Sequence, residues 1–201
     1  MLRTHLVAVA VALAFTGCSG SSGGGSPYGE GDASLAAPNL AGGPIDPFLA
    51  NGQAVLSALD AIAQKSGTPM RVTSMNADRT NGLTVDVQQP ANHVNVDEYV
   101  VAPDGKLSGP IPVKLSAMHG GPVTAADVDA QAFDPKRIAF ARLAETAKEA
   151  IVKSKFSDAR VSEWEINGLG PDARKYIYLD AARGRPVAVV NNDLKIVDMR
   201  F

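Results

Sequence analysis

The chain reads VVNNDLK at residues 189–195 and VVAPDGK at residues 100–106, two stretches that align at a shift of 89 positions. Upstream, Asp134-Pro135 opens a segment with helical spacing of apolar residues, as Asp46-Pro47 does at a shift of 88. Residues 134–201 therefore repeat the plan of residues 45–118, and residues 119–133 connect the two. The repeat predicts an α+β fold of two tandem α-β4 units, in which each antiparallel meander sheet packs against one helix. It leaves open whether the units share one sheet.

Apolar periodicity predicts helices over residues 46–64 and 134–154, with Asp46 as an N-cap and Gly67 as a stop signal. Thr124 to Asp127 could cap a short helical turn in the connector. Pro110 and Pro112 lack backbone donors, so the fourth strand is expected at a sheet edge. Met75 and Trp164 occupy equivalent places in the two units and are expected to pack beneath the helices. Alternation and turn signals predict strands over residues 70–77, 83–88, 94–102, 111–115, 160–166, 175–180, 186–191 and 194–201.

The first 17 residues have the pattern of a secretion signal. Arg3 precedes an apolar run from Leu6 to Phe15, which is about half of the roughly 20 residues that span a bilayer. Residues 15–18, Phe-Thr-Gly-Cys, resemble the lipobox of bacterial lipoproteins, although Phe15 stands where that family most often has Leu. The resemblance implies cleavage before Cys18 and lipidation of this cysteine. The alternative is a soluble exported protein that is cut by the ordinary signal peptidase.

Cys18 is the one cysteine in the chain, so it has no internal disulfide to form. Several acyl chains hold a membrane much more firmly than a single chain does. In Gram-negative lipoproteins, a residue other than Asp after the cysteine implies transfer to the outer membrane, and here Ser19 follows. The resemblance therefore implies a lipid anchor in the outer membrane, with the protein facing the periplasm. Residues 18–44 are rich in Gly and Ser and predict a flexible tether with a reach of about 25–30 Å.

The sequence offers few candidates for chemistry. It lacks a nucleophile elbow, a zinc-protease helix, a phosphate-binding loop and Cys/His metal spacing, so we expect no enzyme activity, no cofactor and no metal. Glu163 and Glu165 share one strand face at a spacing that a glycosidase could use, but a solvated pair beside Arg174 or Lys175 is the preferred interpretation. His93 and His119 are interpreted as loop residues. Asp127, Asp129 and Asp134 lack the ligand order of a calcium loop and are interpreted as caps and loop residues.

Charge argues against nucleic acid as a partner. Loss of Arg3 with the signal leaves 18 of the 19 basic residues against 21 acidic ones, and no basic run stands out.

A helix followed by a four-stranded meander, used twice over residues 46–201, resembles the topology of PepSY-like and β-lactamase-inhibitor-protein-like domains. The resemblance implies that the sheet face away from the helices binds another protein. The candidate contact residues are Tyr176, Tyr178 and Tyr99. The leading hypothesis is a non-enzymatic envelope lipoprotein that binds a protein partner, as an assembly factor or as an inhibitor or immunity factor. The alternatives are a periplasmic carrier of a small apolar ligand and, third, hydrolysis by Glu163 and Glu165.

Overall fold

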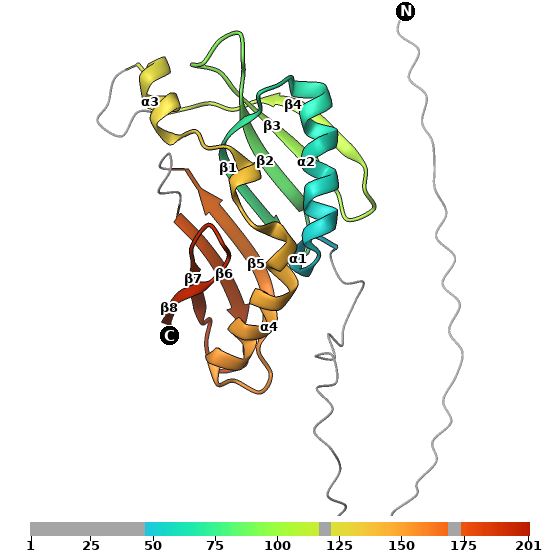
Figure 1. Cartoon of the computed structure of the whole chain (residues 1–201), viewed down its shortest axis with the longest axis vertical. Coiled ribbons are helices and arrows are strands. Elements are labelled where there is room, and N and C mark those ends of the chain that lie inside the picture. The colour runs from blue at the N-terminus through green and yellow to red at the C-terminus, as the bar shows by residue number, and fades with distance from the viewer. Residues whose placement is uncertain (1–46, 117–121, 169–173) are drawn as a thin grey trace, which may run out of the picture. The chain divides into compact units, whose positions relative to one another are not determined.

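The computed structural model describes residues 47–116, 122–168 and 174–201 (Figure 1). Its centre is a single eight-stranded sheet in the order β4-β3-β2-β1-β5-β6-β7-β8, and every neighbouring pair is antiparallel. Two four-stranded meanders therefore run outward from the central β1–β5 pair, so the two halves share one sheet. The strands are β1 Arg71–Asp78, β2 Gly82–Gln88, β3 Val96–Val101, β4 Leu107–Pro112, β5 Arg160–Asn167, β6 Arg174–Asp180, β7 Val187–Val190 and β8 Ile196–Arg200.

Helices α2 and α4 cover one face of this sheet, α2 over the first meander and α4 over the second (Figure 1). The core lies between them and the sheet, and both Met75 and Trp164 are buried in it, as the repeat predicted. The α+β class is thus confirmed. In the parts that the structure describes, no helix is long and apolar enough to cross a membrane. The helical segments are α1 Pro47–Ala50, α2 Gly52–Ser66, α3 Ala125–Gln131, the 3-10 turns η1 Pro135–Arg137 and η2 Phe140–Arg142, and α4 Leu143–Ser154.

Two turns and two strands of the chain share local features at positions 89 residues apart. In the β3–β4 turn, Ala102 N–H donates to the carbonyl of Lys106, and in the β7–β8 turn Asn191 N–H donates to that of Lys195. Gly105 and Leu194 hold equivalent places in these turns, and both have positive φ, at 85° and 53°. Such a φ costs little for glycine and is strained for leucine. Strands β1 and β5 also shift register at positions 89 apart, Thr73 and Ser162.

The first predicted helix is divided in two. Asn51 interrupts it, because its Oδ1 accepts the N–H groups of Gln53 and Ala54 and so caps α2 as a separate helix. Asp46, the predicted cap, lies outside the described residues. The predicted stop is confirmed, since Gly67 follows the last helical residue and its N–H donates to Ala63.

The second predicted helix begins later than expected. Asp134 does act as an N-cap, but of the 3-10 turn η1, and α4 begins only at Leu143. Between them the backbone at Ile138 is extended, and Ala139 N–H donates to the carbonyl of Asn192 in the second meander at 2.9 Å. Ile138 and Phe140 are both buried, so their packing overrides the helical periodicity of the segment.

The fourth strand begins earlier in the chain than predicted, at Leu107 and not at residue 111. Its pairing with β3 starts at Leu107, which lies opposite Val101, because the turn at residues 102–106 closes within a few residues. The strand contains Pro110 and Pro112 and lies at the edge of the sheet, as predicted. The predicted helical turn in the connector is also confirmed, since Thr124 and Asp127 form a capping box at the start of α3.

Candidate functional site

Tyr176 and Tyr178 lie on the face of the sheet opposite α2 and α4. They alternate along β6 with Ile177 and Leu179, which are buried in the core. Their ring centroids are 6.1 Å apart, and both side chains are partly exposed. We call this side the open face, defined by Asp86, Glu98, Glu163, Glu165, Tyr176 and Tyr178. Helix α3 contacts the sheet at the ends of β1 and β2, where Asp129 accepts hydrogen bonds from Arg71 and Gln88.

Charged side chains hold the tyrosine pair in place. Tyr178 OH donates to Glu165 Oε2 at 2.9 Å, and the guanidinium carbon of Arg185 lies 5.0 Å from the centre of its ring. Arg185 also pairs with Glu163 at 3.1 Å, and Arg200 lies 5.7 Å from the Tyr176 ring. Cation–π and ion-pair contacts thus fix both rings without burying them.

The open face is acidic along its middle. Asp86 and Glu98 lie directly opposite each other on β2 and β3, an arrangement in which like charges repel. Ser74 Oγ donates to Asp86 Oδ2 at 2.7 Å, whereas Asp86 Oδ1 is buried with no hydrogen-bond partner in the described structure. Burial raises the pKa of Asp86, and only the Ser74 hydrogen bond opposes this shift. The face therefore holds carboxylates whose charge is incompletely balanced.

Tyr99 does not belong to the open face. It is only 3% exposed and lies opposite Val85 in the β2–β3 pairing, so its ring points into the core beneath the helices. Because Val100 to Ala102 are three apolar residues in a row, the sequence does not show which alternate residues of this strand face the core. Pairing with β2 settles it and rules out Tyr99 as a surface contact.

Glu163 and Glu165 face the same side as the tyrosines, with partners other than those predicted. Glu163 pairs with Arg185, while Glu165 accepts hydrogen bonds from Tyr178 OH and from Asn167 Nδ2. Lys175 does not form an ion pair with either glutamate, because its side chain is buried on the helix-bearing side of the sheet. Both carboxylates thus help to order the tyrosine pair.

The other polar candidates are used in local structure. His93 Nδ1 lies 2.9 Å from Asp129 Oδ1, and hydrogen bonds from Gln88 and His93 lower the pKa of Asp129. Asp127 belongs to the capping box and Asp134 caps η1. Over the described ranges, no group of three or more His, Cys, Asp or Glu could hold a metal ion. Cys18, the tether and His119 lie outside the described residues.

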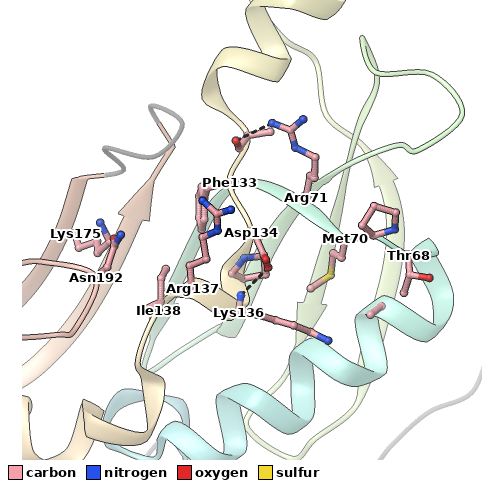
Figure 2. Close-up of a pocket in the computed structure, with 14 residues that line it drawn as sticks. Thr68, Met70, Arg71, Phe133, Asp134, Lys136, Arg137, Ile138, Lys175 and Asn192 are labelled. Carbon is pink, nitrogen blue, oxygen red and sulfur yellow. Dashed lines mark hydrogen bonds between the residues drawn. The ribbon is translucent and has the colours of Figure 1, made fainter.

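A second feature, missed by the sequence analysis, is a hollow of about 570 Å³ on the helix-bearing side (Figure 2). It is lined by the end of α2 and the turn after it, the start of β1, residues 132–138, Lys175 of β6 and Asn192 of the β7–β8 turn. Thr68 and Met70 lie on one side in Figure 2, and Lys175 and Asn192 on the other. The lining residues are far apart in the sequence and no periodicity links them, so no local signal could have found the hollow.

Comparisons with known proteins leave the family open. No protein-family model matches the chain, and no curated protein matches it. Among solved structures, it is similar to a putative lipoprotein from Clostridium difficile 630, with 11% sequence identity and a TM-score of 0.49. That match covers 73% of this chain and 91% of the other. The function proposed below therefore rests on this chain's own residues.

The pKa of Tyr178 gives a direct check of the open face. Burial, followed by the hydrogen bond to Glu165 and the charges of Glu165 and Glu163, raises this pKa to about 12. The resulting stability is fully present below the unfolded tyrosine pKa of about 10 and is lost as pH rises through about 12. We expect an NMR pH titration of ¹³Cζ-labelled tyrosine to show a chemical-shift change for Tyr178 only at high pH, with a midpoint near 12. The Tyr178→Phe variant assigns this resonance. Glu165→Gln removes the carboxylate charge and should bring the midpoint closer to 10; an unchanged midpoint would mean that the charge of Glu165 does not raise the pKa of Tyr178.

Proposed function

We propose that the chain is a non-enzymatic lipoprotein of the bacterial cell envelope whose folded part binds another protein through the open face. The observation that carries this proposal is the Tyr176–Tyr178 pair, which is ordered by charged neighbours and remains partly exposed on a sheet face away from α2 and α4. Tyrosine is enriched in protein interfaces, because its ring supplies apolar area and its hydroxyl a polar contact. Such a pair is a suitable anchor for a partner.

The acidic middle of the face indicates the chemistry of that partner. The carboxyl side chains of Asp86 and Glu98 come from directly opposite positions, and a Lys or Arg from a partner would pair with them. Glu165 adds a carboxylate next to the tyrosines, whereas the charge of Glu163 is paired with Arg185. The partner surface is therefore basic, with an apolar or aromatic group that packs on Tyr176 and Tyr178.

Attachment to the membrane is proposed through Cys18. The support comes from the apolar run at residues 6–15, the lipobox-like residues 15–18 and the Gly/Ser-rich residues that follow. Ser19 after the cysteine favours the outer membrane, and the folded part would face the periplasm on its tether. An assembly factor and an inhibitor or immunity factor both fit this placement.

Site-specific photo-crosslinking in intact cells tests the proposal. We expect a crosslinker at position 178 to capture a discrete envelope protein, and one at Lys148, which is exposed on α4, to capture none. Glu98→Lys in the position-178 variant should reduce the yield at least about fivefold, since it reverses a charge on the open face. Equal adducts at both positions, or a yield unaffected by Glu98→Lys, would exclude the open face as a specific basic-partner surface.

A further inference from the structure

The two edges of the sheet differ in whether they can pair with another strand. On the β4 edge, Pro110 and Pro112 have no backbone N–H to donate, and prolines of this kind protect an edge from other chains. The opposite edge is β8, Ile196–Arg200, which contains no proline and lies at the outer margin of the second meander (Figure 1). Within the described ranges, β7 is its one strand neighbour. The backbone groups on the outer side of β8 can therefore accept a further strand.

Two opposite charges lie on one side of β8. The Arg200 guanidinium carbon is 5.7 Å from the centre of the Tyr176 ring, so Arg200 is on the same side as the open face, together with Asp198 two residues earlier. Met199 lies opposite buried Ala188 and is on the helix-bearing side. Asp198 Oδ2 is 3.4 Å from Arg200 Nε, and both side chains are more than half exposed. This contact uses one oxygen of the carboxylate and one nitrogen of the guanidinium, so each group can bind a further partner.

The charges of β8 are self-complementary in one antiparallel register. When two copies of β8 pair about a two-fold axis at Met199, Asp198 of each copy lies directly opposite Arg200 of the other. Positive and negative charges then alternate around the axis, and the ion pair within each copy is kept. A two-fold axis at Asp198 or at Arg200 would place two like charges directly opposite each other. Charge therefore favours the register centred on Met199.

Exposed apolar side chains lie at both ends of the same edge. Val197 is 63% exposed, and Phe201, which follows β8, is 76% exposed. In the register centred on Met199, Val197 of one copy comes next to Phe201 of the other at each end of the contact. Pairing would thus reduce the contact of these side chains with water, in addition to joining the strand backbones.

We propose that the β8 edge binds the β8 edge of a second copy of this chain. A strand that is added to a free edge gains backbone hydrogen bonds, and its side chains determine which partner fits. The two sheets join into one continuous antiparallel sheet. Both open faces lie on the same side of it, because the two-fold axis is perpendicular to the sheet. This assembly does not depend on the protein partner that is proposed for the open face.

Charge reversal tests both the contact and its register. The protein is the mature chain, residues 18–201, with Cys18→Ser, and sedimentation equilibrium measures its mass as the concentration rises. We expect a reversible equilibrium between monomer and dimer. Asp198→Arg and Arg200→Asp each create two like-charge pairs, so either variant alone should dimerise at least about tenfold more weakly. An equimolar mixture of the two variants restores opposite charges at both pairs and should form a heterodimer about as tightly as the unchanged protein.

Disulfide crosslinking gives a second measurement. Met199→Cys in the same protein places the one thiol of each copy at the two-fold axis, where opposed Cα atoms are about 4.5–5.5 Å apart and within reach of a disulfide. Oxidation should link this variant into dimers faster than Val152→Cys on exposed α4, and the control Lys148→Glu should leave dimerisation unchanged. The proposal would be overturned by a chain that stays monomeric at about 1 mM, by charge variants that do not associate when mixed, or by equal crosslinking at positions 199 and 152.

Discussion

Trp164→Ala is expected to lower the free energy of unfolding by about 4 kcal/mol. Trp164 is the one tryptophan of the chain, is 2% exposed, and packs with its ring centroid 5.8 Å from that of Phe140. Its indole Nε1 donates to the carbonyl of Phe48 in α1 at 2.7 Å. One side chain on β5 thus connects the second meander to the helical segment that begins the first half, and its loss would leave a large cavity at this junction.

Denaturation by urea, followed by far-ultraviolet circular dichroism, measures this effect without tryptophan fluorescence. Trp164→Phe keeps an aromatic ring but removes the donor to Phe48, so a loss of about 1–2 kcal/mol is expected. Val152→Ala on α4, at a residue that is 76% exposed, should change stability by less than about 0.5 kcal/mol. A Trp164→Ala variant as stable as Val152→Ala would show that the two halves do not depend on this contact.

Much of the fold was accessible from sequence, because the relevant signals are local. Leu83, Val85 and Val87 alternate with polar residues, and this fixes both the strand and its buried face. The edge position of β4 follows from its two prolines, since a proline has no backbone N–H to donate to a neighbouring strand. The match of residues 100–106 with 189–195 predicted two turns that do have the same hydrogen-bond pattern.

The remaining features depend on contacts between distant residues. Periodicity favours helix at residues 135–142, but burial of Ile138 and Phe140 and the bond from Ala139 to Asn192 hold this segment outside α4. The two meanders form one sheet because β1 pairs with β5, a strand some 90 residues further along the chain. For the candidate sites, the alternation along β6 correctly predicts that Tyr176 and Tyr178 lie on the face away from the helices. The inward orientation of Tyr99 becomes clear only from the pairing of β3 with β2, and the hollow only from the tertiary structure.

For Gly52→Ala, helix propensity predicts a gain in stability, whereas tertiary packing predicts a loss. Gly52 is the first residue of α2, where alanine has the better helix propensity by about 1 kcal/mol. A Cβ at this position, however, would lie 1.7 Å from the carbonyl oxygen and 2.4 Å from the carbonyl carbon of Phe140. These are backbone atoms of η2, so relief of the clash requires α2 and η2 to move apart.

We therefore expect Gly52→Ala to destabilise the protein by about 3 kcal/mol, at the upper end of overpacking effects. Ser57→Ala, at an exposed position in the same helix, provides the matched control and should be neutral or slightly stabilising. Both variants are compared by urea denaturation. A stabilised Gly52→Ala protein would mean that α2 and η2 do not approach closely in solution. A destabilised one would show that this glycine serves the contact between α2 and η2, the element that leads into α4, and not the local needs of its helix.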